Sequence, residues 1–219
     1  AFFLHRISCK VFFKPCRYRI KYLDTCKVKK RPCRKITQRI NFTILFKNKD
    51  YDKAKELGVS FFTYYLHKTL VAVNSIEPFR YRILNDEVYI FDRIDVSSTI
   101  LREDKTFGFS QIEYSEDLNE FAENTKNEIA RIQTTTGLFT REYSENLIHF
   151  SALPWINFTS FSHARSFSWP DSCPKISFGK MMEENGKKTM SMSIHVHHGL
   201  MDGYHVGEFV ELFQEMMNS

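Results

Sequence analysis

The stretch Thr189 to His198 reads Thr-Met-Ser-Met-Ser-Ile-His-Val-His-His and alternates between two kinds of side chain. One side of an extended chain would carry Met190, Met192, Ile194, Val196 and His198. The other side would carry hydroxyl and imidazole groups, the last of them from His197. Alternation with a period of two predicts a β-strand with one face more buried than the other. Since His198 ends the apolar face, we expect its imidazole to lie in a dry setting.

The residues on either side of this strand extend the prediction. Asn185-Gly186 separates it from another strand-like run, Lys175 to Met182, and Asn-Gly in that position favours a two-residue hairpin turn. Downstream, apolar side chains recur at helical spacing from Tyr204 to Met216, which predicts an amphipathic helix. Asp202 lies at or just before its start, where a carboxylate is electrostatically favoured.

The middle of the chain adds helices and another hairpin. Helical patterns cover Tyr51 to Leu57, Ser60 to Asn74, and Ser115 to Gln133. Ser115 is the expected N-cap of the last helix, and a hairpin is predicted over Phe79 to Asp92, around Asn85-Asp86. Helices that alternate with antiparallel runs predict an α+β fold, a two-layer α/β sandwich with a mixed, largely antiparallel sheet.

His198 and Asp202 are the first candidates for chemistry. A poorly solvated imidazole has a pKa near the range useful for a proton acceptor, and a carboxylate follows it at a strand-to-helix turn. Such a pair can activate a hydroxyl for attack on an acyl group. Spacing alone leaves three other interpretations open. In the first, Asp202 is only a helix cap; in the second, His198 is a core histidine whose hydrogen bonds are satisfied within the protein. In the third, the histidine belongs to a metal site with His195 and His197. No further metal ligand is identifiable, so no metal is expected.

Two segments resemble a known family. His197-His198-x-x-x-Asp202-Gly203-Tyr204-His205 is similar to the active-site signature of the chloramphenicol acetyltransferase family. Its short core also occurs in dihydrolipoyl acyltransferases and other CoA-dependent acyltransferases. The second segment, Phe150 to Phe161, resembles the Ser-Ala-Leu-Pro-Trp-x-x-Phe block of the chloramphenicol enzymes. A looser likeness extends from about Thr37 to the C-terminus.

The resemblance implies that family's fold and an acetyl-CoA-dependent O-acetyltransferase that acetylates the primary hydroxyl of chloramphenicol, an antibiotic-resistance activity. His198 would be the general base of a direct transfer, without an acyl-enzyme. Ser151 would donate a hydrogen bond to the oxyanion of the tetrahedral intermediate. Asp202 would be a structural carboxylate that holds the active-site turn.

The resemblance also implies binding residues. Trp155 would line the coenzyme channel, with a core tryptophan as the alternative, and Ser177 would join the polar network in place of the family's usual threonine. Aromatic walls for a nitrophenyl ring, with ordinary core packing as the alternative, would come from Phe107, Phe109, Phe139 and Phe161. His163 stands where the family often has leucine, and His149 where it usually has asparagine.

The family resemblance further implies a homotrimer with active sites at the subunit interfaces. The histidine would come from one subunit and much of the antibiotic pocket from its neighbour. Two alternatives keep the fold and change the function. One is an acyltransferase that acts on another small hydroxyl or thiol acceptor, and the other is a catalytically idle homologue that sequesters a ligand.

The N-terminal part of the chain differs in composition from the rest. Residues 1–39 contain 13 Lys or Arg and one acidic residue, Asp24, which gives a charge of +12. The remaining residues contain 18 basic and 25 acidic side chains, which gives −7 and recovers the total of +5. Four of the five cysteines also lie here: Cys9, Cys16, Cys26 and Cys33. We therefore divide the chain into a basic, Cys-rich leader of uncertain structure, residues 1–35, and an acyltransferase domain, residues 36–219.

The leader departs from the family's pattern. Its cysteine spacing is not that of structural zinc sites. Its positive charge leaves binding to nucleic acid or an anionic surface open as an alternative, although no nucleic-acid partner is expected. Leu23 to Val28 is the nearest approach to the family's Trp-x-Arg motif, whose arginine normally pairs with the carboxylate equivalent to Asp202. Arg31 or Arg34 is the expected substitute.

Two absences guide the expected location. No apolar run approaches the ~18 residues of a membrane span, and no export signal is recognised. We therefore expect a cytoplasmic protein with no membrane partner. No glycine-rich phosphate loop is present, so nucleotide hydrolysis has no support.

Overall fold

The structure of the protein is a computed structural model that describes residues 11–13, 20–23, 37–46, 48–85, 87–163 and 171–219. In chain order its elements are β1 (Val11–Phe13), β2 (Ile20–Leu23), β3 (Thr37–Phe46), α1 (Asn48–Glu56), α2 (Phe61–Ser75), the 3-10 turn η1 (Glu77–Arg80), β4 (Tyr81–Leu84), β5 (Glu87–Phe91), β6 (Asp95–Leu101), β7 (Phe107–Phe109), α3 (Leu118–Thr134), β8 (Leu147–Ala152), β9 (Lys175–Glu184), β10 (Lys187–His197) and α4 (Gly203–Met217).

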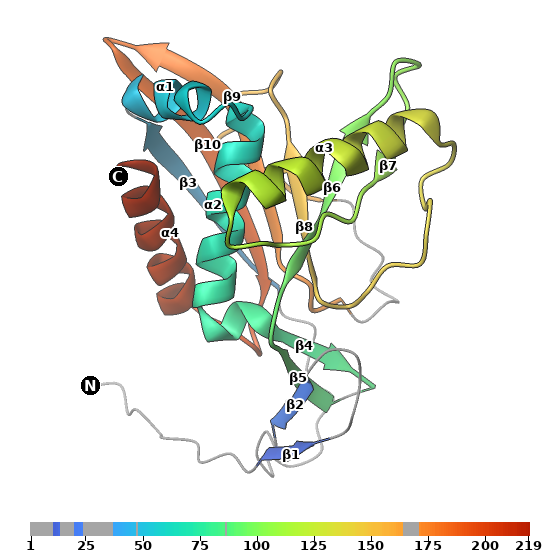
Figure 1. Ribbon diagram of the computed structural model, residues 1–219. Helices are drawn as coiled ribbons and strands as arrows, with labels where there is room; N and C mark the ends of the chain where they lie inside the picture. Colours follow the sequence, from blue (N-terminus) through green and yellow to red (C-terminus); the bar gives the residue numbers. More distant parts are fainter. Residues whose placement is uncertain (1–10, 14–19, 24–36, 47, 86, 164–170) are drawn as a thin grey trace, which may run out of the picture.

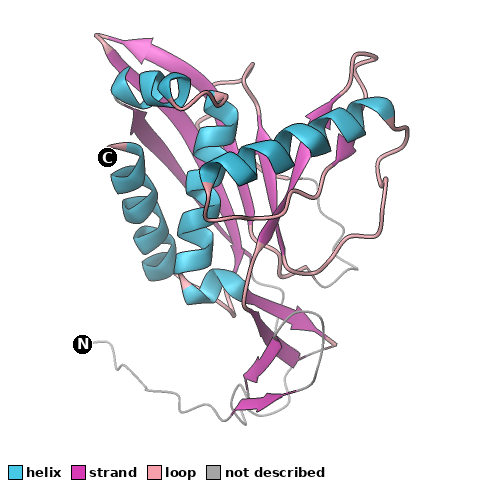
Figure 2. Ribbon diagram, viewed as in Figure 1, coloured by secondary structure: helices cyan, strands magenta, loops and turns pink. Residues whose placement is uncertain are grey.

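A six-stranded sheet forms the centre of the fold (Figure 1). Its strand order is β3-β10-β9-β8-β6-β7. The β6–β8 and β8–β9 pairs are parallel, and the other pairs are antiparallel. Helices α2, α3 and α4 lie along one side of this sheet, with α2 packed beside α4 (Figure 2). The predicted α+β architecture with a mixed, largely antiparallel sheet is confirmed.

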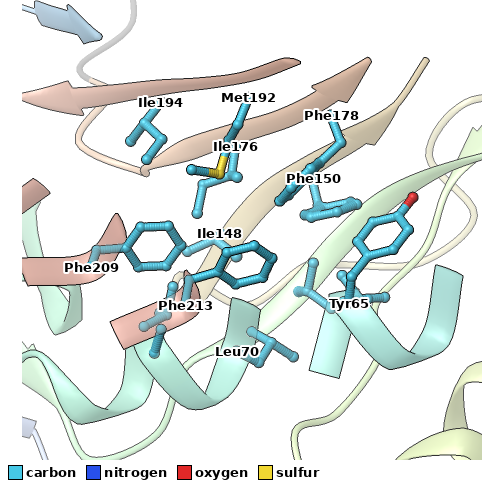
Figure 3. Packing of buried hydrophobic residues seen from close by; sticks show 14 of the residues in the cluster. Tyr65, Leu70, Ile148, Phe150, Ile176, Phe178, Met192, Ile194, Phe209 and Phe213 are labelled. Carbon is cyan, nitrogen blue, oxygen red and sulfur yellow. The ribbon is translucent and has the colours of Figure 1, made fainter. Parts of the chain in front are cut away.

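The core lies between this sheet and the helices (Figure 3). The strands contribute Ile148, Phe150, Ile176, Phe178 and Ile194. Phe213 of α4 packs on Phe178 with ring centroids 5.6 Å apart, and Tyr65 of α2 packs on the same ring at 5.0 Å. Burial of apolar area on this scale supplies the main favourable free energy of folding. Since alternate residues of a strand face opposite ways, the residues next to these on β8, β9 and β10 face away from the helices.

The β9–β10 hairpin has the predicted Asn185-Gly186 turn. Both residues have positive φ, 52° and 72°, which Asn and Gly adopt more readily than other residues. Strand β10 ends at His197, one residue before its predicted end. The apolar face is the more buried one, as predicted, but the difference is small because every side chain from Met190 to His197 is buried. The second face is covered by the loop that follows β8.

The predicted helices are confirmed as α1, α2, α3 and α4. Ser60 is the N-cap of α2, as its position at the predicted start suggested. The N-cap of α3 is Asp117 and not Ser115, because the Asp117 carboxylate accepts hydrogen bonds from two backbone N–H groups of the first turn. Ser115 instead accepts a hydrogen bond from the Asp117 N–H.

A second, four-stranded sheet has the order β1-β2-β5-β4. Strands β4 and β5 form the hairpin predicted over Phe79 to Asp92, with Asn85 at a positive φ of 53°. Strand β2 pairs with β5, so part of the basic leader joins this sheet.

The division of the chain at residue 36 stays a prediction. The described residues do not include several of the leader's candidate residues: Cys9, Cys16, Cys26, Cys33, Arg31 and Arg34. Among the described residues, no helix combines the length and apolar character that a membrane crossing requires.

Candidate active site

Polar side chains line up across the sheet on the face opposite the core. Ser151 of β8 lies opposite Ser177 of β9, which lies opposite Ser193 of β10. The neighbouring row consists of His149, Lys175 and His195. Both rows face away from the helices, since the apolar residues between them face the core. Two candidate residues that are distant in sequence, Ser151 and Ser177, are therefore direct cross-strand neighbours.

A tight turn after β8 is held against β9 beside Ser151. The Lys180 N–H donates a hydrogen bond to the Ile156 carbonyl oxygen at 2.8 Å. Gly179 permits this approach, because a Cβ at that position would lie 2.8 Å from the same oxygen. Ser151 is partly exposed at the start of the turn, and its hydroxyl has no hydrogen-bond partner within the described part of the chain. This hydroxyl is available to donate to a substrate oxygen.

Ser177 is fully buried, and its hydroxyl oxygen is 2.9 Å from Nε2 of His163. The His163 ring packs edge to face against Phe161 at 4.8 Å and against His195 at 5.2 Å. Burial, assisted by the neighbouring His195 and Lys175, lowers the pKa of His163 to about 4. At neutral pH the imidazole is therefore uncharged and can accept a hydrogen bond from the Ser177 hydroxyl. Sequence analysis noted His163 only as a departure from leucine and missed this contact.

Replacing His163 by glutamine is expected to make the protein less sensitive to mild acid. The unfolded chain takes up a proton here near the ordinary pKa of 6.5, whereas the folded chain does so only near pH 4. The free energy of unfolding therefore decreases as the pH falls from 6.5 toward about 4. The loss amounts to up to roughly 3 kcal/mol for a pKa shift of this size. Glutamine retains a hydrogen-bonding group for Ser177 but does not titrate.

Chemical denaturation at about pH 7 and about pH 4.5 measures this effect. The stability lost on acidification should be smaller in His163→Gln than in the wild type. An equal loss in both proteins would contradict a neutral, buried His163.

His198 is the first residue after β10 and is exposed, so the expected dry setting is wrong for a single chain. The strand ends because the chain turns: the His197 carbonyl accepts hydrogen bonds from the N–H groups of Leu200 at 2.9 Å and Met201 at 3.2 Å. His197 is buried, and its Nδ1 accepts from the Gly199 N–H at 3.2 Å. The two adjacent histidines thus have opposite surroundings, and His198 is the one that a substrate or another subunit can reach.

His198 and Ser151 lie too far apart within one chain to act together. His197 is four residues from Ser193 along β10, which corresponds to about 13 Å at the usual rise of a strand. Ser193 and Ser151 are separated by two inter-strand steps, or roughly 10 Å. A separation on the order of 16 Å follows, far beyond the roughly 3 Å over which a base takes a proton. At this backbone separation, one chain does not bring His198 and Ser151 together.

Asp202 is the N-cap of α4, which confirms its predicted position at the helix start. Its carboxylate accepts a hydrogen bond from the Tyr204 N–H at 3.0 Å. His205 completes a capping box, since its Nδ1 accepts from the Asp202 N–H at 3.2 Å. The same Nδ1 lies 3.0 Å from the Asp202 carboxylate, and the expected arginine partners lie outside the described residues. Asp202 therefore secures the turn that carries His198.

Replacing Asp202 by alanine is expected to lower the free energy of unfolding by about 1 kcal/mol, because the first turn of α4 loses its cap. Asp202→Asn is the matched control, since asparagine caps a helix equally well without a charge. Thermal or chemical unfolding measures both variants. A folded Asp202→Asn protein that loses most of its activity would contradict a purely structural role.

The expected binding residues separate into two groups. Trp155 exposes 67% of its surface on the turn after β8, which excludes the alternative of a core tryptophan. Phe109 contacts both Phe107 and Phe139, with ring centroids 5.8 and 5.3 Å apart. The side chains of Phe107 and Phe139 are exposed to solvent. Phe161 lies elsewhere, against Phe158 and His163. One chain therefore gathers three of the four phenylalanines and places the fourth beside the Ser177 network.

A cleft on the polar face is lined by His163, Asp171, Cys173, Lys175, His195, Val196 and His197. Asp171 and Lys175 form an ion pair at its border. The sequence did not point to Asp171, Cys173 and Lys175, because they belong to no recognised motif. The sequence feature that could have indicated a polar cleft here was the pair of histidines, His149 and His163, at positions where the family usually has other residues. In the part of the chain that the structure describes, no cluster of His, Cys, Asp or Glu has an arrangement able to hold a metal ion.

Comparison with known proteins gives consistent matches. The sequence model of the family described as CAT: Chloramphenicol acetyltransferase matches residues 17–214. Chloramphenicol acetyltransferase 3 of Escherichia coli is 31% identical over 186 residues, which are 84% of this chain and 85% of that protein. A chloramphenicol acetyltransferase of Bacillus pumilus is 35% identical over 142 residues, 64% of each chain. A solved chloramphenicol acetyltransferase structure has a TM-score of 0.75 at 28% sequence identity, and the match covers 83% of this chain and 88% of that one.

Proposed function

The chain belongs to the chloramphenicol acetyltransferase family, and on this basis we propose that it transfers the acetyl group of acetyl-CoA to the primary hydroxyl of chloramphenicol. The observation that carries this proposal is the polar row on the sheet. Ser151 and Ser177, which the resemblance assigned to one polar network, are neighbours on adjacent strands, and the Ser151 hydroxyl is available. Such a hydroxyl can stabilise an oxyanion.

In the proposed reaction His198 is the general base. It takes the proton of the chloramphenicol hydroxyl while that oxygen attacks the thioester carbonyl carbon. The carbonyl electron pair moves onto its oxygen, and Ser151 donates a hydrogen bond to this oxyanion. The intermediate then collapses, the carbon–sulfur bond breaks, and the CoA sulfur leaves with the proton held by His198. The transfer is direct, and Asp202 contributes by holding the turn.

We further propose a homotrimer with active sites between subunits. The separation of His198 and Ser151 within one chain supports this arrangement, because a closed ring supplies each Ser151 with the His198 of a neighbour. A neighbouring subunit would also remove His198 from water. The exposed side chains of Phe107 and Phe139 support coverage of that end of the sheet by another surface.

Acetyl-CoA is the proposed co-substrate. The exposed indole of Trp155 lies on the turn that follows Ser151, where it can contact a coenzyme whose thioester reaches the oxyanion donor. Lys180 is exposed on β9 and bonded to the same turn, so it adds a positive charge suited to the CoA phosphates. We also propose a cytoplasmic location.

Incubation with acetyl-CoA and chloramphenicol, followed by detection of free CoA thiol, tests the proposed function. Thiol release that depends on chloramphenicol is expected. If thiol release does not rise above background, the assignment of chloramphenicol as the substrate is wrong. Release with another small hydroxyl or thiol acceptor would keep the acyltransferase and change its substrate, and chloramphenicol binding without turnover would favour a ligand-sequestering protein.

A further inference from the structure

A buried arginine links three backbone segments at the β7 edge of the sheet. Arg102 directly follows β6 and is only 8% exposed. Its Nε donates to the Ile132 carbonyl oxygen of α3 at 2.9 Å, and its Nη2 donates to the Gly137 carbonyl oxygen at 2.7 Å. Its Nη1 donates to the Phe107 carbonyl oxygen of β7 at 2.9 Å and to the Thr106 hydroxyl at 3.2 Å. One guanidinium therefore joins β7, the end of α3 and the loop that follows α3.

Gly108 of β7 leaves the space that this guanidinium occupies. A Cβ on Gly108 would lie 2.5 Å from Nη2 of Arg102 and 3.0 Å from Cγ2 of Ile132. Position 108 thus faces α3. Because alternate residues of a strand face opposite ways, Phe107 and Phe109 face the other side of the sheet, which carries the polar rows of the candidate active site.

The free energy of folding gives little reason for a charge at this position. All four oxygens that accept from Arg102 among the described residues are neutral. A buried cation without a carboxylate partner is costly, and an apolar side chain of similar size often serves stability as well. What the guanidinium provides is geometry, because its planar set of donors fixes the distances between the groups that accept from it.

The loop held by Arg102 carries an exposed aromatic ring. Phe139 is two residues after Gly137 and exposes 74% of its surface, so the core does not hold its ring in place. Its position depends on the backbone bonds just before it. The Gly137 carbonyl oxygen accepts from Arg102, and the Leu138 carbonyl oxygen accepts from the Phe109 N–H at 3.0 Å. These two bonds hold the Phe139 ring against Phe109, with centroids 5.3 Å apart.

We propose that Arg102 is a positioning residue, which holds Phe139 beside Phe109 and Phe107 so that the three rings form one recognition surface for the aromatic ring of the acceptor. The inference rests on the proposed function for the identity of that acceptor, chloramphenicol. Arg102 acts through these rings, since its guanidinium lies on the α3 side of β7 and the rings of Phe107 and Phe109 lie on the other side.

Steady-state kinetics of Arg102→Lys test this role. Lysine keeps the charge but cannot bond to β7, α3 and the loop at once. The KM for chloramphenicol is expected to rise about tenfold, because the ring contacts lose their geometry. The kcat and the KM for acetyl-CoA should stay within about twofold of the wild-type values, a division that a general loss of folded protein would not produce.

Arg80→Lys is the matched control for the kinetic test. The Arg80 guanidinium also donates to backbone carbonyl groups, those of Phe91 and Asp92, but it belongs to the other sheet. Its KM for chloramphenicol should equal that of the wild type. An unchanged KM for chloramphenicol in a folded Arg102→Lys protein, or an equal rise in both variants, would overturn the inference.

Hydrogen exchange without substrate tests the link between Arg102 and the loop. The Phe109 N–H should exchange about tenfold faster in Arg102→Lys, because its acceptor lies on the released loop. Should that variant fail to fold, Gly108→Ala is the second test, since the added Cβ displaces Nη2 from the Gly137 carbonyl oxygen. The same rise in KM and in exchange is expected. An unchanged exchange rate in a folded variant would contradict the role of Arg102.

Calorimetric binding of chloramphenicol separates this inference from the proposed function. If the wild type binds chloramphenicol without turnover and Arg102→Lys binds it about tenfold more weakly, the proposed function alone is wrong. If the wild type turns over and the variant has the wild-type affinity and KM, this inference alone is wrong. A wild type that neither binds chloramphenicol nor turns it over would contradict both.

Discussion

The His198→Ala variant is expected to lose about two to four orders of magnitude in kcat with acetyl-CoA and chloramphenicol. The imidazole is the proposed acceptor of the hydroxyl proton, and alanine leaves the attacking oxygen without a base. Because His198 is exposed at the end of β10, its removal should leave the fold and the free energy of unfolding nearly unchanged. Initial rates of CoA release give kcat and KM, and KM should change little.

His205→Gln is the matched control for this variant. It removes another imidazole from the same turn, one that caps α4 and is assigned no chemistry. Its kcat should stay within a small factor of the wild-type value, with a modest loss of stability. If His198→Ala keeps most of its activity, or if His205→Gln loses as much, the general base lies elsewhere.

The Ser151→Ala variant is expected to lose about a hundredfold to a thousandfold in kcat, the usual cost of removing one oxyanion donor. The hydroxyl acts only when charge develops on the thioester oxygen, so substrate binding should be largely retained. Ser193→Ala is the control, because Ser193 lies on the same cross-strand row and its hydroxyl instead contacts the Phe161 carbonyl oxygen at 3.5 Å. Equal effects at the two positions would contradict a specific role for Ser151.

Mixing the two inactive variants tests the arrangement between subunits. Subunits of His198→Ala retain Ser151, and subunits of Ser151→Ala retain His198. In a mixed oligomer formed by co-refolding, about one site in four would receive a wild-type residue from each side. Activity should therefore reappear in the mixture although neither variant has it alone. A mixture that assembles and stays inactive would mean that both residues of each site come from one chain.

Local sequence patterns predicted most of the elements because each depends on adjacent residues. The Asn185-Gly186 turn follows from the positive φ angles that these residues tolerate, and the cap at Asp202 follows from one carboxylate and the N–H groups beside it. The likeness around Ser151 and around His198 is also a property of short segments. The sequence by itself was therefore sufficient for the α+β class, the family and the candidate residues.

The tertiary structure decided which of these residues meet. Ser151 and Ser177 become neighbours through the parallel pairing of β8 with β9, and His163 reaches Ser177 through the loop that covers β10. The alternation from Thr189 to His198 correctly divided the side chains between two faces, but it could not show that both faces are covered or that the chain turns at His197. Strand periodicity determines which side chains share a face, whereas the burial of that face depends on what distant parts of the chain place over it.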